Sequence, residues 1–200
     1  MTTDENYLPD FTTYVEVTLE RLIVAHIEDS IEQIGRSKGE KLRLFLAARS
    51  VHLALVTALS SALSGTDGTG AMSDKERKAW LRFFDDMRGG LAEAPKTRMA
   101  SFSELLKRAQ ECPTGYIAKP LQLDENEERE LKKLTALRDW TEHPRPDHHL
   151  IEPAWILDAM KVGLRVTQHC TELVWHRYDA LEQERLEALF GELRQKLSTV

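Results

Sequence analysis

Residues 40–64 read EKLRLFLAARSVHLALVTALSSALS, and this stretch decides the fold. Apolar side chains occur on nearly every side of the helix that it predicts: Leu42, Phe45, Leu46, Leu53, Val56, Leu59 and Leu63 on one side, and Leu44, Val51, Leu55 and Ala62 elsewhere. A helix that is apolar nearly all round is expected at the centre of a protein. Arg43, Arg49 and His52 disfavour a membrane span, because a central arginine costs about 2.5–3.5 kcal/mol on insertion scales.

Helical periodicity continues on both sides of this stretch. Apolar residues recur three and four positions apart from Val15 to Ile34, which predicts one face of a long helix over 15–34. Further helices are predicted over residues 73–88, 101–109, 124–143, 153–178 and 179–198. No stretch shows the alternation typical of strands, and no internal repeat is found. The sequence therefore predicts an all-α fold, a bundle of four long helices with additional short helices.

Start and stop signals set the expected helix boundaries. Ser73 and Glu76 have the spacing of a capping box. The acidic run DENEERE, beginning at Asp124, suits a helix N-terminus, where the helix dipole favours negative charge. Pro144 ends that helix, because the residue before a proline is pushed away from helical dihedral angles. Pro153 suits the first turn of the next helix.

Composition indicates one cytoplasmic domain that needs no cofactor to fold. A chain of 200 residues can bury a sufficient core without a metal or a disulfide. The two cysteines, Cys112 and Cys170, lie far apart in the sequence, which suits a reducing compartment. The first ten residues, MTTDENYLPD, are acidic and polar, whereas a signal peptide is basic and then apolar. We expect a single helical domain over residues 1–200, located in the cytoplasm.

The overall charge bears on the partners that the protein can attract. The chain has 27 basic and 33 acidic residues, a formal net charge of −6. The whole molecule should therefore not attract a polyanion at long range. Any binding of nucleic acid must depend on a local basic patch.

The segment LRDWTEHPRP, residues 137–146, contains the residues best suited to chemistry. Arg138 is followed by the acidic Asp139, and His143 comes five positions after the arginine. This pattern resembles the signature of the HEPN superfamily, small helical-bundle proteins of which many cleave RNA. The order of elements is also similar: two long helices, the motif at the end of a later helix, then another long helix. The similarity covers residues 14–178 or so and leaves the amphipathic helix of about 179–198 outside.

A second arginine and histidine, Arg21 and His26, have the same spacing. Leu22 occupies the position where the signature has a polar residue, and the pair lies within a long helix, so a structural role is expected. Arg138, in contrast, lies beside the apolar stripe of its helix. His143 falls where that helix must end, which frees its ring to turn toward the arginine instead of staying roughly 140° away around the axis.

The resemblance implies a metal-independent endoribonuclease with no cofactor, serving as a toxin or in defence against phage. His143 would accept the proton of a ribose 2′-hydroxyl or donate one to the leaving oxygen, because imidazole titrates near neutral pH. Arg138 would bind the phosphate and offset its developing charge. Asp139 would orient one of these side chains. The family also implies a homodimer with the two motifs face to face, and a regulatory partner such as an antitoxin.

Basic residues near the motif are candidate RNA contacts: Arg145, His148, Lys132 and Lys133. Arg145 also marks a departure from the family pattern. Members regulated by a partner nucleotidyltransferase have a tyrosine two positions after the histidine, and this chain has Arg145 there. Control through modification of such a tyrosine is therefore disfavoured.

Each of these residues also has a structural interpretation. Arg138 could form an ion pair with Glu142, four residues on, and His143 could simply interact favourably with the helix dipole. A metal site at His143, Asp147, His148 and His149 is disfavoured, because adjacent histidines in a loop lack the spacing of a preformed site. The four tryptophans are expected to anchor the core. The alternative function is a non-catalytic HEPN-like bundle that binds a protein or a nucleotide.

Overall fold

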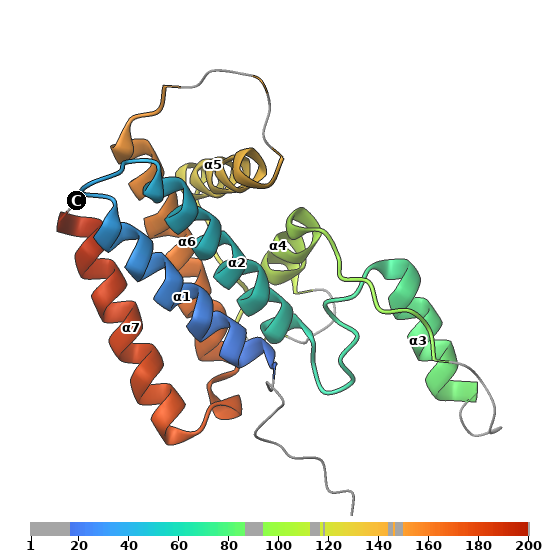
Figure 1. Ribbon diagram of the computed structural model, residues 1–200. Coiled ribbons are helices and arrows are strands. Elements are labelled where there is room, and N and C mark those ends of the chain that lie inside the picture. The colour runs from blue at the N-terminus through green and yellow to red at the C-terminus, as the bar shows by residue number, and fades with distance from the viewer. Residues whose placement is uncertain are drawn as a thin grey trace, which may run out of the picture.

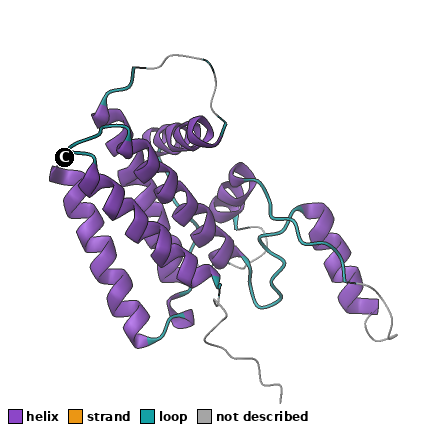
Figure 2. Cartoon of the chain, in the orientation of Figure 1, coloured by secondary structure: helices purple, strands orange, loops and turns teal. Residues whose placement is uncertain are grey.

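The computed structural model describes residues 17–86, 94–112, 117, 119–143, 146 and 150–199. Within these ranges the fold is all-α, as predicted, with no strand and one isolated bridge between Met72 and Met99 (Figure 1 and Figure 2). The helices are α1 (Leu19–Arg36), α2 (Arg43–Leu63), α3 (Asp74–Asp86), α4 (Phe102–Glu111), α5 (Glu125–Glu142), α6 (Pro153–Leu173), the short 3-10 helix η3 (Trp175–Arg177) and α7 (Ala180–Thr199).

The apolar helix α2 lies at the centre of the bundle, in contact with α1, α4, α5 and α6 (Figure 1). Fourteen of its 21 residues are buried, so its predicted central position is confirmed. In the described ranges α2 is also the one helix long and apolar enough to cross a membrane. This is weak evidence for a span, because the buried core helix of a soluble protein meets the same criterion.

The helix α1 packs its apolar face on α2. Ile23 and Ile27 are fully buried, and Ile34 nearly so. The helix begins at Leu19, later than the predicted start at residue 15, because Thr18 is extended and its side chain accepts a hydrogen bond from the backbone N–H of Arg21. A threonine in this position ends the helical hydrogen-bonding pattern in the N-terminal direction.

Both predicted boundaries of α5 agree with the structure. Asp124 and Glu127 form a capping box: the Asp124 carboxylate accepts from the Glu127 backbone N–H at 2.8 Å, and the Glu127 carboxylate accepts from that of Asp124 at 3.2 Å. At the other end His143 has non-helical dihedral angles, φ −128° and ψ 70°. The buried face of α5 carries Leu131, Leu134 and Leu137.

The helix α6 is shorter than predicted. It starts with Pro153 in the first turn, as expected, but ends at Leu173, and residues 175–177 form η3 instead of a further helical turn. Tyr178 is extended. The prediction of one helix over 153–178 was wrong at its end, because Val174 and Tyr178 remain buried and continue the apolar pattern past the last helical residue.

The C-terminal helix α7 alters the predicted count of long helices. It has 20 residues and buries Leu186, Phe190, Leu193 and Leu197. It packs along α1 and α6 (Figure 1). Five of the described helices, α1, α2, α5, α6 and α7, therefore have 18 to 21 residues, and the predicted four-long-helix bundle is not confirmed.

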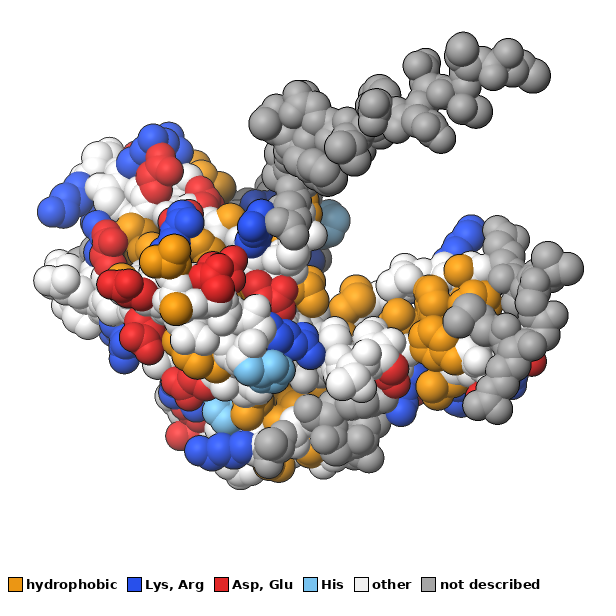
Figure 3. All heavy atoms as spheres, turned by 90° about the horizontal axis from the view of Figure 1, so that it is seen from below, with side chains coloured by type: hydrophobic (Ala, Val, Ile, Leu, Met, Phe, Trp, Pro, Cys, Tyr) orange, Lys and Arg blue, Asp and Glu red, His pale blue; other side chains and the backbone are white. Residues whose placement is uncertain are grey.

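The helix α3 projects from the rest of the bundle (Figure 1) and has no buried residue. Its aromatic residues Trp80, Phe83 and Phe84 contact one another, and Figure 3 shows hydrophobic side chains gathered on this helix. The segment before it is attached to α4 through the buried guanidinium of Arg108. That group donates to the backbone oxygens of Gly70 and Met72, at 3.0 and 2.7 Å.

The helix α6 comes very close to α2 and α5 at Gly163. A β-carbon added at Gly163 would lie 2.5 Å from Cδ2 of Leu134 and 2.9 Å from Cγ1 of Val51. Both distances are shorter than van der Waals contact, and both neighbours are fully buried. Only glycine fits at this position without displacing the core.

Replacing this glycine should destabilise the protein. Gly163→Ala is expected to lower the free energy of unfolding by about 1–2 kcal/mol, because the added methyl group overpacks the core. Gly191→Ala in α7 is the matched control: its β-carbon has nothing within 4 Å, so the helix preference for alanine should stabilise the protein by up to about 1 kcal/mol. Urea unfolding followed by circular dichroism measures both changes. Equal effects of the two substitutions would contradict this packing.

Candidate functional site

The guanidinium of Arg138 is held in place by two carboxylates of its own helix. Its Nη1 donates to Oε2 of Glu142 at 3.1 Å, and its Nε lies 3.2 Å from Oδ1 of Asp139. The Arg138 side chain is 27% exposed, so part of it still faces solvent. The ion pair with Glu142 that the sequence offers as the structural interpretation is therefore present.

Glu142 connects this pair to the central helix. Its other carboxylate oxygen, Oε1, lies 3.3 Å from Nε of Arg49 in α2. Burial raises the pKa of the Glu142 carboxyl, but the hydrogen bond and charge of Arg138, together with those of Arg49, outweigh burial and lower it below its ordinary value. Contacts thus run from Arg49 of α2 to Glu142, from Glu142 to Arg138, and from Arg138 to Asp139. This alternation of positive and negative groups fixes the position of Arg138.

His52 in α2 is a site residue that sequence reasoning missed. The sequence analysis uses His52 only as an argument against a membrane span. In the structure it is 2% exposed, and neither of its ring nitrogens has a hydrogen-bond partner in the described part of the chain. Its ring packs against that of Phe102, with 5.0 Å between centroids. Burial, and then the charge of Arg138, lower the His52 pKa to about 4, against the opposing charges of Asp139 and Glu142. The imidazole is therefore neutral at pH 7 and lies within the field of the motif arginine.

The sequence offered one signal for His52: it is a polar residue within an apolar stretch. That signal could have predicted burial, because α2 is apolar on nearly all sides. The neighbours of His52 come from α4 and α5, however, and nothing in the local sequence identifies them.

His143 lies at the C-terminal end of α5 and is exposed. Its backbone N–H donates to the carbonyl oxygen of Asp139 at 2.8 Å. Among the described side chains, no hydrogen bond joins the His143 imidazole to Arg138. The two residues of the motif are thus on the same end of the same helix, with the arginine anchored and the histidine exposed.

The four predicted RNA contacts have different surroundings. Lys132 is exposed and lines a groove between α4 and α5. Lys133 is engaged elsewhere: its ammonium lies 2.6 Å from a carboxylate oxygen of Glu130 and 5.1 Å from the ring centroid of Trp155. Arg145 and His148 lie outside the described residues.

The alternative metal site cannot be assembled from the described residues. His143 is described, whereas Asp147, His148 and His149 are not. Within the described ranges, no group of three or more His, Cys, Asp or Glu side chains is arranged to hold a metal ion.

The groove between α4 and α5 has a volume of about 460 Å³ and ends at Arg138. Its lining combines cations, hydroxyls and apolar side chains: Ser101, Phe102, Ser103, Leu106, Lys107, Gln110, Glu128, Leu131, Lys132, Thr135 and Arg138. The motif arginine therefore borders a cavity large enough for a small polar ligand.

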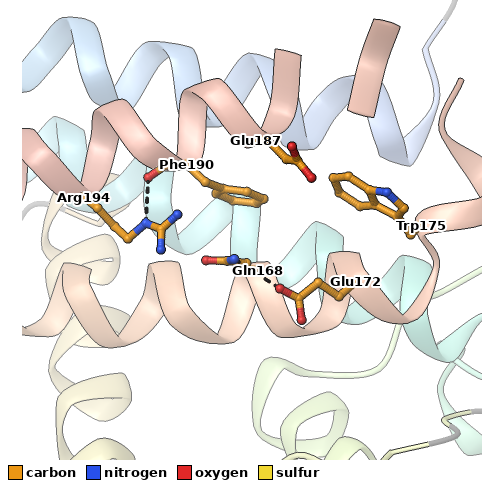
Figure 4. A pocket seen from close by; sticks show the side chains of 6 residues that line it. All are labelled: Gln168, Glu172, Trp175, Glu187, Phe190 and Arg194. Carbon is orange, nitrogen blue, oxygen red and sulfur yellow. Dashed lines mark hydrogen bonds between the residues drawn. The ribbon is translucent and has the colours of Figure 1, made fainter. Parts of the chain in front are cut away.

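A second hollow, of about 560 Å³, lies between α6 and α7 (Figure 4). Trp175 and Arg194 stand at its two ends with Phe190 between them, and Gln168, Glu172 and Glu187 complete the lining. None of these residues belongs to the Arg138 cluster. This hollow is larger than the α4–α5 groove, but it lies apart from the Arg138–His143 motif.

The other arginine and histidine of matching spacing lie in α1. Nε of Arg21 is 4.0 Å from a carboxylate oxygen of Glu182 in α7, so this arginine helps to join two helices. Burial, and then the charge of Arg49, lower the pKa of His26, whereas Asp29 raises it. These contacts agree with the structural role expected for the pair.

Two tryptophans next to the motif pack as the sequence predicts. Trp140 and Trp155 stack with 6.3 Å between ring centroids, and both lie against the hydrophobic core. This contact joins the last turns of α5 to the first turn of α6.

A search with protein-family models found no match for this chain, and comparisons with curated proteins and with solved structures found none either.

The buried state of His52 predicts a loss of stability in acid. Because the His52 pKa is about 4 in the folded protein and 6.5 ordinarily, the unfolded chain binds a proton first as the pH falls through this window. Stability should therefore decrease progressively from pH 6.5 to pH 4. His52→Leu removes this contribution, so the variant should lose about 2 kcal/mol less than the wild type between about pH 7 and about pH 5.

Urea unfolding at the two pH values measures this difference. His26 is unchanged in both proteins, so its own lowered pKa cancels in the comparison. The same pH dependence in both proteins would show that His52 is not the buried neutral group.

Proposed function

We propose that this protein is a HEPN-like, metal-independent endoribonuclease that acts through Arg138 and His143. The proposal rests on one observation: α5 carries Arg138 at the end of a cationic groove and stops five residues later at an exposed imidazole. A phosphate that leaves the groove would meet a fixed guanidinium first and an accessible base next.

Arg138 would act on the phosphate of the scissile bond. A guanidinium can offer two parallel N–H groups to phosphate oxygens, and it stabilises the negative charge that builds up on them. Asp139 and Glu142 hold the arginine in one orientation before RNA binds. Glu142 also has Arg49 as a partner, so a phosphate could replace it at Arg138 without leaving the carboxylate unpaired.

His143 would carry out the proton transfer. As a base it takes the proton of the ribose 2′-hydroxyl, the 2′-oxygen forms a bond to phosphorus, and the bond from phosphorus to the 5′-oxygen breaks. The leaving 5′-oxygen takes a proton from a second acid. In the family arrangement this acid is the histidine of a second copy, so we propose that the active form is a homodimer.

Local charge would have to overcome the charge of the whole molecule. The net charge of −6 repels RNA at a distance, but Lys107, Lys132 and Arg138 concentrate positive charge along the groove. A regulatory protein, such as an antitoxin, could block the enzyme by covering this groove and the end of α5.

The alternative proposal is a non-catalytic bundle that binds a protein or a nucleotide. It is favoured by the contacts of Arg138, whose partners among the described residues are all carboxylates of this chain, as a structural arginine would have. Catalysis is therefore the property to test first.

The test is cleavage of mixed RNA by purified protein with a chelator present. The wild type should cut RNA, and His143→Ala should reduce the rate by roughly 10²–10⁴, the usual contribution of a general acid or base. His176→Ala replaces another exposed histidine, in η3, and should leave the rate unchanged. Gel electrophoresis of end-labelled RNA measures the rates. Full activity of His143→Ala would remove this residue from the mechanism, and no cleavage by any of the proteins would favour the binding function.

A further inference from the structure

The groove between α4 and α5 has two chemically different ends. At one end Gln110 of α4 donates to a carboxylate oxygen of Glu128 in α5, at 3.3 Å. At the other end Phe102 and Arg138 are close, because His52 packs on the ring of the first and lies in the field of the second. The two helices therefore run in opposite directions along the groove, and the N-terminus of α4 is next to Arg138.

Positive charge is concentrated along this groove. Lys107 of α4 and Lys132 of α5 are both exposed, and Arg138 is partly exposed. Glu128 is the single carboxylate in the lining, and it already accepts a hydrogen bond from Gln110. The hydroxyl groups of Ser101 and Ser103 lie 3.1 Å apart at the Arg138 end. Just outside the lining, Glu111 lies 3.9 Å from Lys107 Nζ, and Asp139 and Glu142 pair with Arg138. A phosphate would compete with these carboxylates for the cations, whereas the lining itself, with three cations and one carboxylate, is complementary to phosphate groups.

The floor of the groove is apolar and contains an aromatic ring. Leu131 is buried there, and Phe102 and Leu106 are half-buried. The back of the Phe102 ring rests on His52, which burial keeps uncharged, so the ring has a firm support. The part of the phenyl ring that remains exposed offers a nucleobase a surface to stack on.

The length of the groove and its position on α5 relate it to His143. The lining residues of α5 extend from Glu128 to Arg138, a rise of about 15 Å along the helix axis, and His143 lies about 7.5 Å further. The imidazole is thus at the same end of α5 as Arg138, and a strand with a phosphate at Arg138 would have to bend around the end of the helix to reach it.

We propose that this groove binds unpaired nucleotides of single-stranded RNA, with a base on Phe102 and phosphates between Lys107, Lys132 and Arg138. The inference rests on the proposed function, for which it names the substrate class. A duplex is excluded because its bases are stacked on each other and cannot reach Phe102, whereas unpaired bases can be splayed onto an aromatic side chain.

The experiment measures the affinity of the full-length His143→Ala protein for a short fluorescein-labelled RNA, single-stranded or annealed to its complement, by fluorescence anisotropy. The His143→Ala background keeps the probe intact. We expect roughly tenfold tighter binding of the single strand than of the duplex, in line with the loss of one stacked base. Equal or tighter binding of the duplex, or no binding of either RNA, would overturn the proposal.

The groove itself is tested with Lys107→Ala combined with Lys132→Ala. Both lysines are exposed, so the substitutions should not affect folding. The slope of log K against log salt concentration should become less steep by about 1.4, because each phosphate contact on a single strand contributes about 0.7. Lys161→Ala, at an exposed lysine of α6, is the matched control and should leave the slope unchanged. An unchanged slope in the double variant would place the RNA elsewhere on the protein.

Phe102→Leu tests the stacking surface. It keeps an apolar side chain of similar size over His52, and circular dichroism verifies folding. Affinity for the single strand should fall roughly 5- to 100-fold, and affinity for the duplex should not change.

This experiment and the cleavage test can fail separately. Binding that depends on the groove, without any cleavage, would retain the binding site and reject the ribonuclease. If cleavage depends on His143 but the groove substitutions leave RNA binding unchanged, the ribonuclease proposal is retained and this binding site is rejected.

Discussion

Burial of most of α2 is the constraint on which the rest of the structure depends. Fourteen of its 21 residues are buried, and α1, α4, α5 and α6 all contact it, while Leu46 and Arg49 keep one stripe of the helix in contact with solvent. Small residues allow the neighbours to come close: Ala47, Ala54 and Ala58 are fully buried, and Gly163 of α6 contacts the same core. The hydrophobic effect thus selects the number and the arrangement of the surrounding helices.

The polar residues of α2 connect this core to the candidate site. Arg49 reaches the end of α5 through Glu142, and His52 is enclosed beneath Phe102 without a hydrogen-bond partner among the described residues. A buried polar group without a partner is costly, and a buried charge more so, which is why the imidazole stays neutral. The site arginine is therefore positioned by the central helix as well as by its own.

Two electrostatic influences of opposite sign would act on any RNA. The molecule as a whole is acidic, with a net charge of −6, whereas the groove beside α5 combines Lys107, Lys132 and Arg138. Salt screens the distant repulsion more than the short-range contacts within the groove. Binding would therefore depend on groove geometry more than on long-range attraction, and this would favour a partner whose shape fits the groove over polyanions in general.

Much of the fold could be predicted from local sequence. Apolar periodicity, together with capping serines for the helix over 101–109, predicts the α-helices of the described residues. Asp124, Pro144 and Pro153 locate both ends of α5 and the start of α6, because caps and prolines act within a few residues. The end of α6 could not be predicted in this way. Val174 and Tyr178 stay buried after the helix has stopped, and periodicity reports burial without identifying the backbone conformation.

For the candidate site, the sequence by itself determined that Arg138, Asp139 and His143 share the end of one helix. Only the tertiary structure decided what surrounds them. Lys132 and Lys133 are neighbours in sequence, yet one lines the α4–α5 groove and the other is held by Glu130 and Trp155. His52 is more than eighty residues from Arg138 in the chain and still lies in its field. Contacts of this kind arise from helix packing, which depends on the shapes of distant surfaces and leaves no mark at a single position.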